Sequence, residues 1–258
     1  MMNPNEIIIL ILSTKSKIYD EMKIAQRLTW INNAKHKGIN CFFYEGSNSI
    51  KQTVIEDDVI TVPCDDELKS CSLKFKLALK AVLTKYKNTK IIYRTNLSSY
   101  IDIDVFLSSL SVLENPESDY SGYNGYFNKY TEYLYRFKFF RNRVIRCPFK
   151  QMIKFCSGSG VFIGRNYFDA ILNDVKYDDY IDDVMIRLAI GINPKRHIDR
   201  FDFVSNNNYL CELVDYEDRL DNGLFHYRFK TDNRINDAKL LYLCHDLDIR
   251  KCLCIKIH

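Results

Sequence analysis

The sequence lacks any apolar run long enough to cross a membrane. A membrane-spanning helix needs roughly 18 or more consecutive apolar residues, whereas the apolar run at residues 7–12 is far shorter. Glu6 precedes this run and no small-residue cleavage site follows it, which is not typical of a signal peptide. We therefore expect no membrane span, and we interpret residues 7–12 as a buried strand.

A paired cysteine pattern is also missing. The chain has nine cysteines, an odd number, and their spacing is irregular. Cys252 and Cys254 form a lone C-x-C, with no second pair at the spacing of a zinc site. We expect reduced thiols that act mostly as small apolar side chains, as in a cytoplasmic protein.

Neither sign of charge dominates. The 37 basic and 33 acidic side chains leave a formal net charge of +4, and the basic residues are spread along the chain. This balance allows an anionic small ligand but does not indicate nucleic acid. Hydrophobic residues make up 47% of the 258, enough for a sizeable core. No repeat, low-complexity tract or linker is visible, so we expect one domain over residues 1–258.

The order of apolar runs and helical periodicities in the first part of the chain predicts an α/β fold. Strand-like runs alternate there with segments whose apolar residues recur at helical spacing. The expected elements are strands at residues 6–12, 40–44, 58–62 and 90–95 and helices at residues 17–35 and 67–86. This order favours a mainly parallel central sheet flanked by helices.

The second part of the chain is less regular. Residues 115–150 alternate tyrosine, phenylalanine and arginine, which we interpret as strands and a long loop that form a sheet edge or a substrate wall. The other expected elements are a helix at 100–113, a strand at 155–164 entered through a glycine turn, a short helix at 166–173 and a closing helix from about residue 236.

An acidic stretch precedes one short apolar helix. The aspartates are Asp178, Asp179, Asp182 and Asp183, and the apolar run that follows ends at Gly191. We predict a helix over residues 183–190, with Asp182 as its N-cap and Gly191 as its left-handed stop. Carboxylates at the mouth of a buried helix suit a general base. Aspartates also favour the positive end of a helix dipole, and on this stretch alone capping is the stronger interpretation.

Polar residues follow two of the predicted strands. Arg27 lies in an R-x-T-W segment after the first strand, and Arg94, Asn96 and Ser98 lie in the turn after residues 90–95. In an α/β sheet, groups beyond the carboxyl ends of the strands face the ligand crevice. A surface arginine and a helix cap would give the same residues, so each motif is weak alone.

A glycine-containing segment lies at residues 156–160, CSGSG. Gly158 would let the backbone approach a ligand closely, and Ser159 stands beside it. The segment lacks the lysine of a Walker motif, so it is not a P-loop. An ordinary turn at the start of a strand is the alternative.

A basic segment closes the candidate motifs. If residues 225–229 are extended, His226, Arg228 and Lys230 share one face, and Arg234 follows shortly after. These groups can neutralise a diphosphate. A solvated charged strand is the alternative.

In their order and spacing, these motifs resemble glycosyltransferase family 31, the β-1,3-galactosyl and N-acetylglucosaminyl transferase and Fringe-like group, which has a GT-A fold. The resemblance runs roughly from residue 6 to 191, and its most specific parts are the CSGSG and IDDV segments. The basic segment looks like the terminal segment of related viral and bacterial glycosyltransferases. The segments that carry the resemblance are residues 27–30, 56–62, 76, 96–100, 156–160 and 181–184.

The resemblance implies a Rossmann-like GT-A fold, with a nucleotide-binding half over about residues 1–100 and an acceptor-binding half over about 101–258. It implies inverting transfer of a sugar from a nucleotide-sugar, usually UDP-linked, to a hydroxyl of a glycan or glycoprotein. Asp183, or its neighbour Asp182, would be the general base. The implied donor-binding residues are Arg27, Lys76, Arg94, Asn96, Ser98, Gly158, Ser159, His226, Arg228, Lys230 and Arg234.

The chain departs from the family at its D-x-D metal motif, which falls at Asn96-Leu97-Ser98. Amide and hydroxyl groups are weak ligands for a hard divalent cation. We therefore expect transfer without Mn²⁺ or Mg²⁺, with Arg228, Lys230 and Arg234 stabilising the departing diphosphate. If this expectation is wrong, Mn²⁺ or Mg²⁺ is the cofactor. The absent anchor and disulfide pattern indicate a bacterial or viral enzyme of the cytoplasm, or of the host cytoplasm if viral.

Two other functions stay open. A catalytically inactive nucleotide-sugar or glycan-binding module is favoured by the lost D-x-D motif. A nucleotidyltransferase would need a loop rich in glycine and lysine after the first strand, and residues 13–20 contain no glycine.

Overall fold

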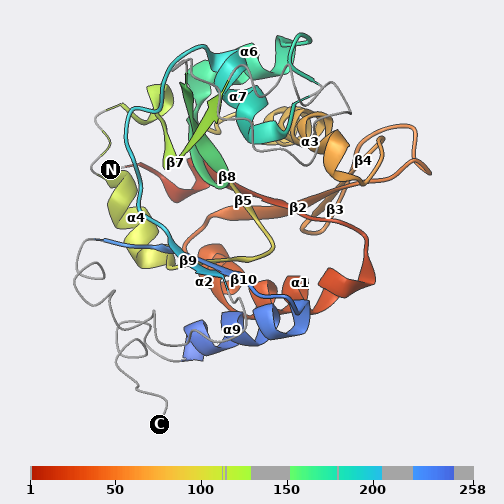
Figure 1. The fold of residues 1–258 in the computed structure, drawn as a ribbon, viewed down its shortest axis with the longest axis vertical. Helices are drawn as coiled ribbons and strands as arrows, with labels where there is room; N and C mark the ends of the chain where they lie inside the picture. Colours follow the sequence, from red (N-terminus) through yellow and green to blue (C-terminus); the bar gives the residue numbers. More distant parts are fainter. Residues whose placement is uncertain are drawn as a thin grey trace.

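The computed structural model describes residues 2–111, 113, 115–128, 152–178, 180–204 and 223–246. Within these residues the chain forms a large sheet, a small sheet and two layers of helices (Figure 1). Much of the aromatic stretch that we expected to form a substrate wall lies outside the described residues, as do Asp179, Cys147, Cys211, Cys252 and Cys254.

The large sheet has seven strands in the order β3-β4-β2-β1-β5-β8-β7. Its strands are β1 (Ile7–Leu12), β2 (Asn40–Gly46), β3 (Val54–Glu56), β4 (Val59–Val62), β5 (Ile91–Asn96), β7 (Tyr120–Asn128) and β8 (Met152–Gly164). The central strands β4, β2, β1 and β5 are parallel, whereas β3, β8 and β7 pair in antiparallel fashion. The expected α/β fold with a mainly parallel centre is confirmed.

Helices cover both faces of this sheet. The helices on one face are α1 (Asp20–Leu28), α2 (Trp30–His36), α4 (Ile103–Ser111) and α9 (Arg234–Asp246). Those on the other face are α3 (Cys71–Lys85), α6 (Phe168–Asn173) and α7 (Asp182–Ile190) (Figure 1). Ile7, Ile9 and Ile11 of β1 pack in the first core and Ile8 and Leu10 in the second, so the strand is apolar throughout.

The small sheet joins distant parts of the chain. It contains β6 (Ser99–Ile101), β9 (Phe201–Val204) and β10 (His226–Lys230), in the order β6-β10-β9. The predicted extended conformation of the basic segment is therefore confirmed. Because β10 pairs with β6, and Phe229 N donates to Ser98 O at 2.8 Å, this segment lies beside the turn that follows β5.

Two predicted helices have different bounds. Residues 17–35 are interrupted at Thr29, whose hydroxyl donates to Ala25 O at 2.7 Å and so takes the carbonyl that its own amide would use in a continuous helix. The helix expected from residue 100 is preceded by β6 and begins at Ile103. The closing helix begins at Arg234, close to the expected position.

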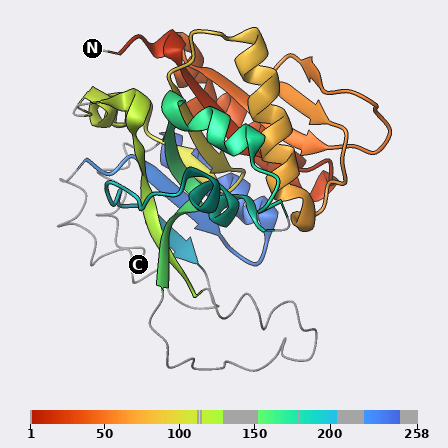
Figure 2. The ribbon, with the colours of Figure 1, turned by 90° about the horizontal axis from the view of Figure 1, so that it is seen from above.

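Three local features differ from the predictions. β3 was missed, and its hairpin with β4 turns at Asp57, which has φ 50°. The strand expected at residues 155–164 is confirmed as part of β8, which pairs with β7, but the CSGSG segment lies within this strand and is not a turn (Figure 2). The N-cap of α7 is Ile181 and not Asp182, whereas Gly191 does end the helix at φ 78°. Within the described residues, no helix is long and apolar enough to cross a membrane.

Candidate functional site

A cavity of about 340 Å³ lies beyond the carboxyl ends of β1 and β5. This is the edge of an α/β sheet at which ligands bind. The residues that line the cavity are Leu12, Ser13, Thr14, Tyr19, Met22, Asp66, Leu68, Cys71, Lys74, Asn96, Leu97, Ser98, Arg228, Lys230 and Arg234. The structure thus brings together five of the residues predicted to bind the donor, from the turn after β5 and from the basic segment.

The turn after β5 is held by one side chain of α1, Gln26, and one of α2, Trp30. Gln26 is fully buried, and its Nε2 donates to the carbonyl oxygens of Asn96 at 3.1 Å, Leu97 at 2.7 Å and Ser99 at 2.9 Å. Trp30 Nε1 donates to the same Ser99 oxygen at 3.1 Å. Side chains of α1 and α2 therefore shape the floor of the cavity.

The polar groups of this turn do not suit a hard divalent cation. Asn96 Oδ1 already accepts hydrogen bonds from Ser98 N at 3.1 Å, Ser98 Oγ at 2.7 Å and Ser99 Oγ at 3.2 Å. Asp66, the carboxylate that lines the cavity, pairs with Lys74 at 3.0 Å. Within the described part of the chain, no three His, Cys, Asp or Glu side chains are grouped to bind a metal.

Positively charged side chains form another part of the cavity wall. Arg228 and Lys230 project from β10, and Arg234 begins α9. Arg234 pairs with Asp237 at 2.6 Å, but Lys230 is exposed and forms no ion pair within the described ranges. Burial, and then the charge of Arg200, lower the pKa of Arg228. The wall is therefore electropositive and incompletely neutralised.

Asp183 lies half-buried at the start of α7, the place predicted for a general base. One carboxylate oxygen accepts from Gly158 N at 3.0 Å and the other from Val184 N at 2.8 Å. Burial, and then the neighbouring charge of Asp182, raise the pKa of Asp183 to about 6, although Gly158 N, Arg94 and Val184 N oppose the shift. The carboxyl group therefore changes protonation near neutral pH.

Asp182 has a different environment from its neighbour. It is buried and forms an ion pair with Arg94 of β5, which is also buried. Arg94 Nε donates to Tyr44 Oη at 3.1 Å. Burial lowers the pKa of Arg94, but the charges of Asp182, Tyr44 and Asp183 and the hydrogen bond to Tyr44 together outweigh burial, so the pKa is raised. Asp182 is thus engaged in an ion pair, whereas Asp183 forms none among the described residues.

The glycines of β8 are required by close approaches. A Cβ on Gly158 would lie 2.3 Å from Arg94 Nη1 and 3.3 Å from Asp183 Cβ. A Cβ on Gly160 would lie 2.5 Å from His226 Nδ1. The CSGSG pattern therefore marks a place where two side chains cross the strand, rather than a turn.

His226 is buried between Tyr93 and Ser99 and does not line the cavity. Its Nδ1 is 2.7 Å from Tyr93 Oη and its Nε2 is 2.8 Å from Ser99 Oγ. Burial, and then Arg200, lower its pKa well below the usual range, so the ring is neutral. The cationic side chains of this region that line the cavity are thus Arg228, Lys230 and Arg234.

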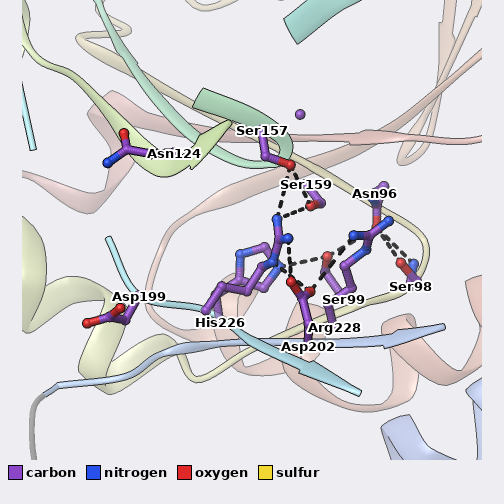
Figure 3. A network of polar contacts seen from close by, with 12 residues as sticks. Asn96, Ser98, Ser99, Asn124, Ser157, Ser159, Asp199, Asp202, His226 and Arg228 are labelled. Carbon is purple, nitrogen blue, oxygen red and sulfur yellow. Dashed lines mark hydrogen bonds and ion pairs between the residues drawn. The ribbon is translucent and has the colours of Figure 1, made fainter. Parts of the chain in front are cut away.

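Sequence reasoning missed Arg200, which contacts three residues labelled in Figure 3: Ser157, Ser159 and Asp202. This buried side chain forms a bidentate ion pair with Asp202, at 2.8 and 2.6 Å, and donates to the hydroxyls of Ser157 and Ser159. The spacing Arg200-x-Asp202, which places both side chains on one face of an extended segment, was a signal that could have identified the pair.

Two predicted donor-binding residues lie elsewhere. Arg27 forms a bidentate ion pair with Asp58 at 2.9 Å and lies over the Phe43 ring, 4.9 Å from its centre. Lys76 ties α3 to the loop before α7 by bonding Asp174 and Asp178. Neither side chain lines the cavity, and their donor-binding roles stay predictions that this geometry does not favour.

The comparisons with known proteins agree with this architecture. Residues 23–196, more than half of the chain, match the family model described as Galactosyltransferase. The chain belongs to this family of glycosyltransferases, and the resemblance to glycosyltransferase family 31 is confirmed. The matched region includes Asp183 and the turn after β5 but ends before β9 and β10.

A solved structure shares the fold. It is described as a glycosyltransferase involved in the glycosylation of the major capsid of PBCV-1. The match covers 92% of this chain and 98% of that chain, with a TM-score of 0.53 and 10% sequence identity. At that identity the likeness shows the fold alone. No curated protein sequence matches significantly.

The support of the turn by Gln26 gives a testable prediction. Gln26→Leu should lower the free energy of unfolding by about 1–3 kcal/mol, because buried carbonyl oxygens lose their donor. Gln52→Leu, at an exposed position, is the matched control and should change little. Chemical denaturation measures both, and equal stabilities would contradict the role given to Gln26.

Proposed function

We propose that this protein is an inverting glycosyltransferase that moves a sugar from a nucleotide-sugar, UDP-linked, to a hydroxyl of a glycan or glycoprotein. The family supports glycosyl transfer, and β-1,3 linkage follows from the family resemblance alone. The observation that carries the mechanism is Asp183. Its carboxylate is oriented by Gly158 N and Val184 N, and it has a pKa of about 6. We also propose that the protein works in the cytoplasm.

In this mechanism, the acceptor oxygen attacks C1 of the sugar on the face opposite the diphosphate. Asp183 takes the acceptor proton as the new glycosidic bond forms. The bond between C1 and the diphosphate oxygen breaks at the same time, and the nucleoside diphosphate leaves with the electron pair. General-base catalysis of such a step contributes roughly 10²–10⁴-fold in rate.

Asp183 does not line the cavity, but its charge acts on Cys71 at the start of α3, which does. Cys71 lines the cavity, and its pKa is raised to about 11 by burial and then by the charges of Asp182 and, in part, Asp183. A donor whose diphosphate occupies the cavity would thus present its sugar on the Asp183 side. This arrangement supports a reaction centre between the two clusters.

Cationic side chains take the role that a metal has elsewhere in such enzymes. The leaving diphosphate gains negative charge as the bond breaks, and preorganised cations stabilise that charge without rearranging. Arg228, Lys230 and Arg234 line the cavity that would hold it. A guanidinium group matches phosphate oxygens with two parallel hydrogen bonds.

A binding module without turnover is the second candidate. The replacement of the D-x-D motif by Asn96-Leu97-Ser98 favours it. The two candidates differ in one observable: an enzyme releases free nucleoside diphosphate when donor and acceptor are mixed, and a binding module does not.

Removal of the proposed base should separate binding from turnover. Asp183→Asn should reduce kcat by about 10²–10⁴-fold and leave donor affinity nearly unchanged, because the amide oxygen still accepts one backbone hydrogen bond. Asp169→Asn is the matched control, since Asp169 is an exposed acid in the first turn of α6. Steady-state kinetics and calorimetry measure the two effects. Full activity of Asp183→Asn would refute the assignment.

The pKa of Asp183 predicts an acidic limit to activity. Below a pH of about 6 the carboxyl group is protonated and cannot accept the acceptor proton. We therefore expect kcat to fall about tenfold for each pH unit below that value and to level off above it. A pH–rate profile measures this, and constant activity from about pH 4.5 to 8 would exclude Asp183 as the base.

The residues that line the cavity predict that chelators have little effect on the transfer rate. Treatment with EDTA should leave transfer nearly unchanged. The cavity is lined by cationic side chains, and the side-chain oxygen of Asn96 already accepts three hydrogen bonds, so it is a poor metal ligand. Initial rates with and without EDTA, and after added Mn²⁺, measure this. A steep loss that Mn²⁺ restores would show that cations of the chain do not replace the metal.

A further inference from the structure

We propose that Arg200 is a positioning residue for the transfer reaction. It holds the strand that orients the base, and it holds Asp202, which would otherwise pair with the arginine that faces the leaving group. This inference rests on the proposed function, because it assigns a role within the same site. It concerns a side chain that lines no wall of the cavity.

The geometry of Arg200 points to this role. Its side chain is only 4% exposed, and its guanidinium contacts groups on three sides. Nε and Nη2 bind Asp202, Nη1 donates to both Ser157 and Ser159, and the group lies 4.2 Å above the centre of the Tyr123 ring. A guanidinium offers donors in a fixed planar fork, which makes such a link rigid.

One end of the link reaches the proposed base. Ser157 and Ser159 flank Gly158 on β8, and Gly158 N donates to Asp183 Oδ2 at 3.0 Å. Side chains alternate along a strand, so both serines lie on the face opposite the position of a Gly158 side chain. By holding both hydroxyls, Arg200 fixes the peptide segment whose N–H orients Asp183.

The other end reaches the electropositive wall. Asp202 gives both oxygens to Arg200 at 2.8 and 2.6 Å, whereas Arg228 Nη1 lies 3.8 Å from Asp202 Oδ1. Arg228 Nε is buried and has no hydrogen-bond partner among the described residues. Arg200 thus holds Asp202 at the closer distances and leaves Arg228 only the longer ion pair (Figure 3). In this proposal Arg228 is therefore able to bind an anion.

An ordinary buried ion pair is the simpler explanation, and it predicts a loss of stability alone. The positioning role predicts a change at Asp183. If β8 loosens, Asp183 loses part of its hydrogen bond from Gly158 N. This hydrogen bond favours the ionised carboxylate, so its loss should raise the pKa of Asp183. Substitution of Arg200 leaves in place the other groups that act on Asp183, which are Asp182, Arg94, Val184 N, Cys71 and Cys156.

The first test is an NMR titration of the Asp183 carboxyl carbon, which needs no substrate. Arg200→Met and Arg200→Lys should each raise the midpoint by about one pH unit, a tenfold change in proton affinity. Lysine keeps the positive charge but cannot bridge Asp202 and both serines. Arg165→Met is the matched control, since Arg165 holds the carbonyls of Lys87 and Thr89 away from the site. It should leave the midpoint unchanged.

A shift in Arg200→Met alone would mean that charge and not position matters, and no shift in either variant would leave only a structural ion pair; both results overturn the proposal. If Arg200→Met does not fold, the Ser157→Ala/Ser159→Ala double variant keeps the Arg200 to Asp202 pair and should give the same shift. An unshifted midpoint there would also overturn it.

The second test uses UDP as the probe in calorimetry. Arg200→Met should weaken UDP binding about tenfold, because Asp202 is then free to pair with Arg228. Arg200→Met/Asp202→Ala should recover most of that loss, and failure to recover it would overturn this half of the proposal. If the unmodified protein does not bind UDP, the proposed function fails, while the titration still decides the role of Arg200.

Discussion

The site depends on one buried ion pair, between Arg94 of β5 and Asp182 of α7. Desolvating two charges is costly, and removing one partner of such a pair typically costs about 3–5 kcal/mol. The pair therefore fixes the start of α7 against the middle of the large sheet. Asp183 is the next residue, so the same contact sets the position of its carboxylate. Tyr44 completes the arrangement by accepting from Arg94 Nε at 3.1 Å.

The two adjacent carboxylates consequently have different surroundings. Asp182 forms an ion pair with the Arg94 guanidinium, whereas burial, and then the charge of Asp182, raise the pKa of Asp183. The proposed base is therefore Asp183. Sequence alone could not choose between them, because both stand in the same acidic stretch. The choice follows from Arg94, which lies far away in the chain and reaches only Asp182 with an ion pair.

Features with a local cause were predicted from the sequence, and features set by distant partners were not. The apolar run of β1 and the stop at Gly191 follow from periodicity and from glycine at a left-handed position. Arg27 was predicted to bind the donor from its place after a strand, and its ion pair with Asp58 was not foreseen. Arg200 was not identified, since only the fold brings it to the serines of β8. The break at Thr29 likewise depends on a side-chain hydrogen bond that competes with the helix.

The uncharged turn after β5 and the cationic basic segment are electrostatically linked. A divalent cation beside Arg228, Lys230 and Arg234 would be repelled by them, and no carboxylate in Asn96-Leu97-Ser98 offsets that repulsion. Conversely, carboxylates in this turn would neutralise the cationic wall and weaken its attraction for a diphosphate. β10 pairs with β6, which follows the turn directly, so the fold places the basic segment beside the turn. The absence of carboxylates from this turn is therefore electrostatically consistent with the cationic residues of β10 and α9 beside it.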